Sequence, residues 1–260
     1  MNANAVPSSE RVRPRARVVK RALLGLLLAL LLFELYARFP STARLRPLVL
    51  PADTEELVLI FHGTGGLDEP TLIALTQRFD SLGRERSHRR VQRYLWSPFS
   101  DNIFRAAAHG THLGHALGRE LSGLHRLRSL RLIAHSAGSY ILDPLCESYR
   151  SLTLQPAHIE MTFLDPIGTT GTWDYGYGYR NHGRCADFAS ATINTDDPVP
   201  GTNAPAEQAA NLDVTQAPER AAFRGEGHVW PVQYYLDHLT GEQATPRLRN
   251  HQLFPRGSGR

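Results

Sequence analysis

Short apolar runs that end in turns of small residues are the main pattern of this chain. Residues 57–61 are all apolar and lead into a glycine-rich segment at 62–66, and the mostly apolar residues 130–133 lead into a second turn of small residues. A continuous apolar run of this length predicts a strand that is buried on both faces. We therefore predict that both runs are central strands of a parallel sheet.

Strands and helices are predicted to alternate along the rest of the chain. The further elements are a strand at 91–96, a helix at 105–121, strands that end near residues 165 and 197, and a helix that starts at residue 231. In the helix, Leu113, Leu117 and Leu121 form an apolar stripe suited to packing on a sheet. The alternation predicts an α/β fold with a mostly parallel central sheet and helices on both faces.

The amino-terminal part differs from the rest in charge and hydropathy. Six cations lie within residues 1–21, and the apolar run from Ala22 to Phe33 follows them. A basic segment before a leucine-rich run is typical of an export signal or an anchor. No small-residue cleavage site follows at the usual distance, so we predict an uncleaved signal anchor, a transmembrane segment at 22–39. The predicted location is the bacterial inner membrane, with the folded domain extracytoplasmic and facing the periplasm.

The predicted organisation is a basic segment at 1–21, the anchor at 22–39, a linker at 40–54, one α/β domain at 55–245 and a loosely ordered tail at 246–260. The chain has a net charge of +4, whereas its first 21 residues hold six cations and one acid and so carry +5. The remaining residues are close to neutral, which argues against a nucleic-acid partner. Cys146 and Cys185 are an even pair, and the sequence leaves open whether they form a disulfide.

The serine in the second turn lies between small residues. Ala134 and Gly138 stand two positions before and after Ser136. A strained strand-to-helix turn accepts only small residues at these positions and exposes the serine hydroxyl. The commoner pattern has glycine where this chain has Ala134. The segment predicts a nucleophile elbow, and its alternative is an ordinary strand-to-helix connection.

A serine nucleophile needs a histidine base and a carboxylate that orients the base, and the chain supplies them in the order serine, acid, histidine. His228 is the predicted base, because a glycine-flanked loop precedes it and a helix follows it. His238 is predicted inside that helix and His251 in the polar tail. The carboxylate is Asp165 or Asp197, since each follows a predicted strand and precedes a proline.

These features together resemble the α/β-hydrolase fold, with the local pattern of pancreatic-type lipases, over roughly residues 55 to 240. The similarity lies in the elbow, in the glycine-rich turn after residue 61 and in Leu164-Asp165-Pro166. It implies Asp165 as the acid, with Asp197 as the alternative. A third carboxylate, Asp213, is predicted to organise a loop. The similarity also implies an oxyanion hole formed by the backbone N–H groups of Thr64 and Ala137.

The function that the resemblance implies is hydrolysis of carboxylic esters, with lipid esters as the leading substrates, by a lipase or esterase that needs no cofactor. Two alternatives stay open at this point: an acyltransferase with the same triad, and a membrane-anchored binding domain without catalysis. A metal site is not predicted, because none of the twelve histidines forms a His-Glu-x-x-His pair.

Overall fold

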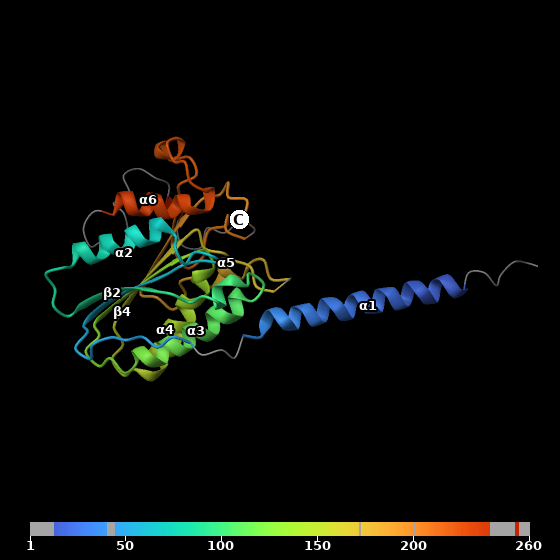
Figure 1. The fold of residues 1–260 in the computed structure, drawn as a ribbon, viewed down its shortest axis with the longest axis horizontal. Helices are drawn as coiled ribbons and strands as arrows, with labels where there is room; N and C mark the ends of the chain where they lie inside the picture. Colours follow the sequence, from blue (N-terminus) through green and yellow to red (C-terminus); the bar gives the residue numbers. More distant parts are fainter. Residues whose placement is uncertain (1–12, 41–44, 172, 200, 240–252, 255–260) are drawn as a thin grey trace, which may run out of the picture.

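A seven-stranded sheet forms the centre of the protein in the computed structural model, which describes residues 13–40, 45–171, 173–199, 201–239 and 253–254 (Figure 1). The strands are β1 (Glu56–Phe61), β2 (Arg89–Tyr94), β3 (Ser129–His135), β4 (His158–Leu164), β5 (Phe188–Ile193), β6 (Ala210–Asp213) and β7 (Leu253–Phe254). Their order in the sheet is β2-β1-β3-β4-β5-β6-β7. All neighbouring pairs are parallel except β6 and β7, which are antiparallel.

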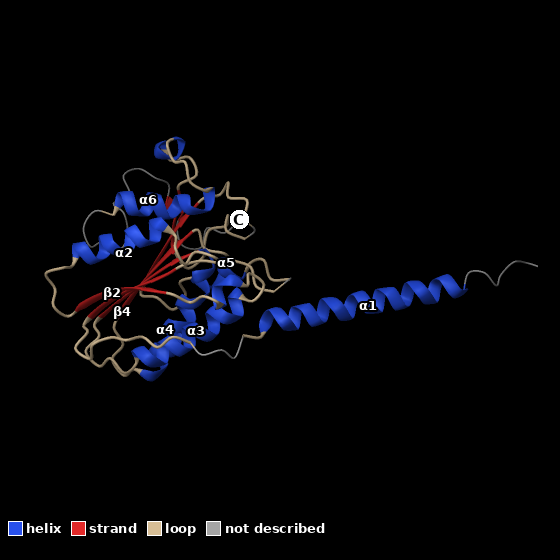
Figure 2. Cartoon of the chain, viewed as in Figure 1, coloured by secondary structure: helices blue, strands red, loops and turns tan. Residues whose placement is uncertain are grey.

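Helices cover both faces of this sheet (Figure 2). The helices are α1 (Arg13–Arg38), α2 (Pro70–Leu82), α3 (Ala106–Leu121), α4 (Ser139–Leu152), α5 (Tyr177–Asn181) and α6 (Trp230–His238). Helices α2 and α6 lie on one face, and α3 and α4 lie on the other (Figure 1). The structure therefore confirms the predicted α/β fold, and this arrangement agrees with the α/β-hydrolase resemblance.

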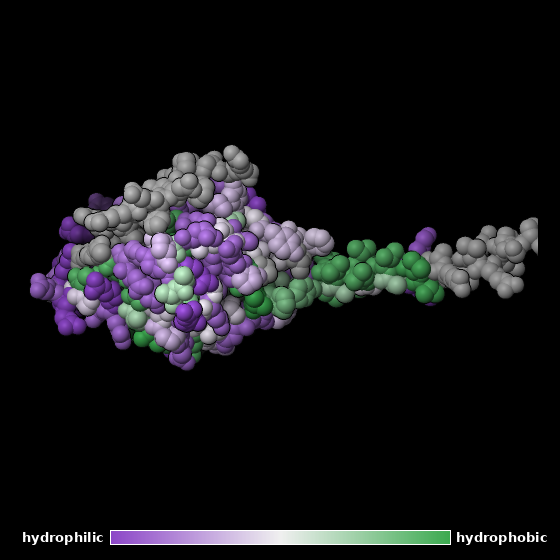
Figure 3. Space-filling model, turned by 90° about the horizontal axis from the view of Figure 1, so that it is seen from above, coloured by the Kyte–Doolittle hydropathy of each residue, from purple (hydrophilic) through white to green (hydrophobic). Residues whose placement is uncertain are grey.

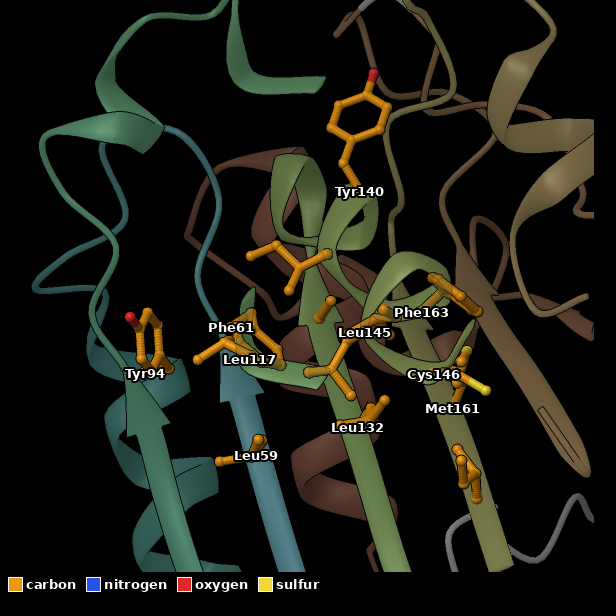
Figure 4. Packing of buried hydrophobic residues seen from close by; sticks show 14 of the residues in the cluster. Leu59, Phe61, Tyr94, Leu117, Leu132, Tyr140, Leu145, Cys146, Met161 and Phe163 are labelled. Atoms are coloured by element: carbon orange, nitrogen blue, oxygen red, sulfur yellow. The ribbon is translucent and has the colours of Figure 1, made fainter. Parts of the chain in front are cut away.

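Strand β1 shows why its apolar run is continuous. Leu59 and Phe61 pack in the same buried cluster as Leu117 of α3 (Figure 4). Ile60 points to the opposite face and packs with Leu72 of α2. Because helices cover both faces, successive residues of the strand are all buried, and each must be apolar.

The predicted strand at 91–96 is displaced by two residues. Strand β2 begins at Arg89 and ends at Tyr94, and Trp96 lies beyond it. Trp96 donates its backbone N–H to Nε2 of His62 (3.2 Å) and its ring N–H to the carbonyl of His62 (2.7 Å). These bonds fix the tryptophan to the loop after β1. The side chain of Trp96 therefore stabilises that loop and is not part of β2.

The predicted membrane-spanning anchor at 22–39 is not shown. Helix α1 covers this region up to Arg38 and projects from the domain with apolar side chains on its surface (Figure 3). Among the described residues, no helix combines the length and the apolarity that crossing a membrane requires. Cations precede Ala22, and Glu34 follows Phe33. The uninterrupted apolar part is therefore about 18 Å long at 1.5 Å per residue, against a hydrocarbon core of roughly 30 Å.

The structure decides whether the two cysteines form a disulfide. Cys146 of α4 and Cys185, which follows α5, form a disulfide that links residues 39 positions apart. Asp143, one turn before Cys146, accepts the backbone N–H groups of Gly183 (2.9 Å) and Cys185 (3.0 Å). The segment between β4 and β5 is thus fixed to α4. Of the predicted tail at 246–260, only β7 lies within the described residues.

Candidate active site

Ser136 lies on a sharp turn between β3 and α4. Its backbone has a φ of 53°, in the left-handed region that residues other than glycine seldom adopt. The turn η2 (Ser136–Gly138) leads directly into α4. A side chain at Gly138 would place its Cβ 2.9 Å from the carbonyl oxygen of His62, which explains why this position is a glycine. The strand, the strained serine and the helix have the geometry of a nucleophile elbow.

The loop after β1 lies directly against this serine. A Cβ atom on Gly63 would stand 2.6 Å from Cβ and 3.1 Å from Oγ of Ser136. His62 is fully buried, and its Nδ1 donates to the carbonyl of Gly63 (2.8 Å) while its Nε2 accepts the backbone N–H of Trp96. Burial lowers the pKa of His62, so the ring is neutral and holds the loop. The loop therefore lies against the turn at Ser136 through Gly63, the residue before Thr64.

His228 lies in the turn η4 (Gly227–Val229), just before α6, and meets both candidate acids. Its Nδ1 is 2.9 Å from Oδ2 of Asp165 and 2.6 Å from Oδ2 of Asp197. Burial alone would lower the pKa of His228, but the two carboxylates raise it above its ordinary value. From the sequence, Asp165 and Asp197 were alternatives for the single acid that orients the histidine. The structure brings both carboxylates to the same nitrogen of His228.

The two carboxylates come from neighbouring strands of the sheet. Asp165 follows β4 with a φ of 47°, and the backbone N–H of Asn194 donates to its Oδ1 (2.9 Å). Asp197 lies in the loop after β5, where the hydroxyl of Thr202 is 2.9 Å from its Oδ2. Parallel strands end at the same edge, so β4 and β5 bring residues 32 positions apart in the chain to one histidine.

His135 was not singled out by the sequence analysis. Its ring lies against the ring of His228, with 4.6 Å between the centroids, and its Nε2 donates to the backbone carbonyl of His228 (3.0 Å). Burial lowers the pKa of His135 to about 3, so this neighbour is uncharged. The residue before Ser136 therefore holds the ring of His228 in place. Its place beside Ser136 is the only signal that the sequence offers for this role.

Nε2 of His228 is buried and has no hydrogen-bond partner among the described residues. Ser136 and His228 are thus linked through His135 and are not hydrogen-bonded to each other. Hydrogen bonds between nucleophile and base often tighten only when substrate binds. The free nitrogen is the atom that a serine hydroxyl would use.

Two other residues that the sequence singled out, Asp213 and His238, make contacts of their own. Asp213 accepts the backbone N–H of Thr215 (2.9 Å) and lies 3.2 Å from the hydroxyl of Thr195, in agreement with the expected loop-organising role. His238 is the last residue of α6 and its Nδ1 bonds to the carbonyl of Tyr234. His251 lies outside the described residues.

Donor atoms of Asp165, Asp197 and His228 lie within 4.8 Å of one another, a spacing that would also suit a cation. We do not assign them as metal ligands. Each carboxylate accepts a backbone N–H besides facing Nδ1 of His228, from Asn194 and Val199 respectively. A hydrogen-bonded group of this kind orients a histidine without any metal.

A separate cavity of about 470 Å³ lies between the end of α1, helix α3 and the segment before α5. Ala37, His112 and Tyr177 are among its lining residues, whereas Ser136, Asp165 and His228 are not. This hollow is therefore distinct from the candidate active site.

Comparison with known proteins adds little to this description. No protein-family model matches the chain, and no curated protein matches it. Among solved structures, the chain is similar to the crystal structure of Aspergillus fumigatus lipase B, with 13% sequence identity and a TM-score of 0.38. The match covers 64% of this chain and 47% of that chain, so it spans about half of the fungal lipase. The fold is accordingly assigned from the sheet and the elbow described above.

Proposed function

We propose that this protein is a serine hydrolase that cleaves carboxylic esters, in the manner of a lipase or esterase. The observation that supports this most is the strained Ser136 at the carboxyl edge of the sheet, next to a buried histidine that two carboxylates hold. Serine nucleophiles of hydrolases sit on such turns, and their base is oriented by a carboxylate at Nδ1.

The proposed mechanism uses each group once in each half-reaction. Nε2 of His228 takes the proton of the Ser136 hydroxyl while Oγ attacks the ester carbonyl carbon. The N–H groups of Thr64 and Ala137 stabilise the oxyanion. His228 then gives its proton to the departing alcohol. The acyl group remains bonded to Oγ of Ser136 as an acyl-enzyme. Water, activated by the same nitrogen, releases the carboxylic acid and restores the serine.

A series of p-nitrophenyl esters of increasing acyl length tests the activity of the full-length protein. We expect release of both the alcohol and the free acid, with a preference for one range of chain lengths. Transfer of the acyl group to an added alcohol, without free acid, would indicate an acyltransferase instead. Absence of any turnover by the folded protein would favour a domain that binds without catalysis.

Gly63→Ala should reduce kcat strongly, because its new Cβ would stand 2.6 Å from Cβ of Ser136 and push the loop away. Displacing one oxyanion donor costs about 10²- to 10³-fold in kcat. The matched control is Gly66→Ala in the same loop, whose new Cβ would have its nearest neighbour at 3.3 Å. Equal kcat values for the two variants, measured on one ester, would contradict this role of the loop.

We further infer an extracytoplasmic location at the bacterial inner membrane, with α1 in contact with lipid. The disulfide between Cys146 and Cys185 is typical of proteins that fold in an oxidising compartment. The consecutive residues Leu26, Leu27 and Leu28 of α1 are all exposed, so apolar side chains point outward on more than one side of the helix. Lys20 and Arg21 precede this stretch and suit an anionic lipid surface.

Flotation with vesicles that contain anionic lipid checks the lipid contact. We expect the full-length protein to float with the vesicles, and the variant Leu27→Lys/Leu31→Lys to remain at the bottom of the gradient. Leu152→Lys/Leu154→Lys is the matched control, because these leucines are also exposed but lie on the domain. Flotation that is equal for both double variants would show that α1 does not mediate the contact.

A further inference from the structure

Two buried carboxylates face a single ring nitrogen in the candidate active site. Oδ2 of Asp165 and Oδ2 of Asp197 lie 2.9 Å and 2.6 Å from Nδ1 of His228, and the two side chains are 0% and 1% exposed. Nδ1 carries at most one proton, so it can donate to only one of them at a time. Two negative charges this close and this far from water repel each other strongly.

We propose that Asp165 and Asp197 share one proton, so that Asp197 is the charged partner of His228 and Asp165 is a neutral acid that donates its proton to Asp197. The inference rests on the proposed function and refines it. It assigns the orienting charge to the residue that the sequence analysis ranked second. It makes Asp165 a positioning residue that acts through Asp197.

Hydrogen-bond donors favour Asp197 as the charged member. Its Oδ1 accepts the backbone N–H of Val199 (3.2 Å), and its Oδ2 faces both Nδ1 of His228 and the hydroxyl of Thr202 (2.9 Å), whose single proton is shared with the carbonyl of Val199 (2.8 Å). Asp165 has one such donor besides His228, the backbone N–H of Asn194 at Oδ1. A carboxylate keeps its charge where more donors reach it, and the carboxyl with fewer donors holds the proton more readily.

The electrostatics of the pair agree with this assignment. Burial raises the pKa of Asp165 to about 7, and its hydrogen bond with Asp197 acts in the same direction. Burial would also raise the pKa of Asp197, but hydrogen bonds from Asp165 and Thr202 outweigh it, so that this pKa lies below its ordinary value.

Three histidines of the described part of the chain lie around the pair. His228 faces it from the turn before α6, and His135 faces it from the end of β3. Beyond His135 lies His62, on the loop after β1. Burial lowers the pKa values of His135 and His62, so both rings are neutral. His228 is therefore the ring in this group that takes up a positive charge during the proposed reaction, opposite Asp197.

Two asparagine variants test the assignment. Asp165→Asn replaces a neutral acid by a neutral amide that can still donate to Asp197, so we expect ester hydrolysis within about tenfold of the wild type. Asp197→Asn removes the carboxylate that holds the charge, but it also removes the repulsion that keeps Asp165 protonated, so that Asp165 ionises 2.9 Å from Nδ1 of His228. We therefore expect kcat to fall by more than about tenfold, yet by less than the roughly 10⁴-fold that loss of a sole triad carboxylate costs. The opposite ranking of the two folded variants would overturn the proposal.

The pH dependence of unfolding supplies a readout that does not need activity. An acid whose pKa is about 7 when folded and ordinary when unfolded binds its proton more tightly in the native state, so the stability it contributes falls as pH rises from about 4 to about 7. Asp165→Asn should remove this part of the slope. An unchanged slope would overturn the proposal, whereas a changed slope in a protein without turnover would refute only the proposed hydrolase function.

Two further variants complete the experiment. Asp143→Asn is the control, because burial raises the pKa of this distant acid to about 6. Its loss should change the pH dependence of the free energy of unfolding but leave kcat for ester hydrolysis unchanged. If an asparagine variant does not fold, kcat of Thr202→Val is measured in its place. This substitution removes one donor from Asp197 and should lower kcat several-fold, whereas unchanged kcat would contradict Asp197 as the charged member.

Discussion

Ser136→Ala is expected to abolish ester hydrolysis, with a loss of about 10⁶-fold in kcat, because removal of a serine nucleophile stops formation of the acyl-enzyme. The same variant should lose covalent labelling by a fluorophosphonate probe, which reacts preferentially with an activated serine. The activation is expected because His228, the proposed base, has a buried Nε2 without a hydrogen-bond partner among the described residues and carboxylates at its other nitrogen. Labelling and turnover can be measured on the same purified full-length protein.

Ser151→Ala is the matched control for this experiment. Ser151 lies near the end of α4, where its exposed hydroxyl bonds to the carbonyl of Ser148. The control should label and turn over as the wild type does. Labelling that persists in Ser136→Ala would mean that another residue reacts with the probe, and the proposed mechanism would then be wrong.

Gly114→Ala should lower the free energy of unfolding, by an amount at the upper end of the range of about 1–3 kcal/mol for overpacked sites. Helices α3 and α4 touch closely at this point. A Cβ on Gly114 would stand 2.4 Å from the carbonyl oxygen of Ile141 and 2.9 Å from the backbone nitrogen of Leu145. Backbone atoms of a packed helix cannot move aside singly, so α4 as a whole would shift. The gain of about 1 kcal/mol in helix propensity offsets part of the cost.

Urea unfolding of the wild type and the variant measures this difference. Gly123→Ala is the control, because the nearest atom to its new Cβ would be the carbonyl oxygen of Glu120, at an ordinary 3.4 Å. We expect a lower midpoint for Gly114→Ala with an unchanged slope, and a midpoint near that of the wild type for Gly123→Ala. Midpoints that agree for all three proteins would contradict the close packing of α3 on α4.

The parts of the fold that the sequence predicted well are those that neighbouring residues encode. The apolar run of β1 and the small residues around Ser136 record constraints that act within a few positions: burial on both faces in the first case and a steric limit in a tight turn in the second. The boundaries of β2 were less accurate, because Trp96 is apolar for a reason that lies in another segment, the loop at His62.

Helix α1 illustrates a different limit. Its leucine-rich composition and the preceding cations predicted an anchor, whereas the flanking charges leave an apolar part that is short for a bilayer. Composition describes what a helix prefers as its surroundings. Whether the helix crosses a membrane depends on the length over which that preference continues.

The sequence by itself determined the α/β alternation, the turn at Ser136 and the small set of carboxylates and histidines from which a triad could be drawn. Only the tertiary structure decided that Asp165 and Asp197 both reach His228, that His135 supports the ring of that base, and that Cys146 pairs with Cys185. The physical reason is that these contacts join residues 31 to 93 positions apart. Their closeness follows from the order of parallel strands and from where each strand ends, which no local pattern of residues records.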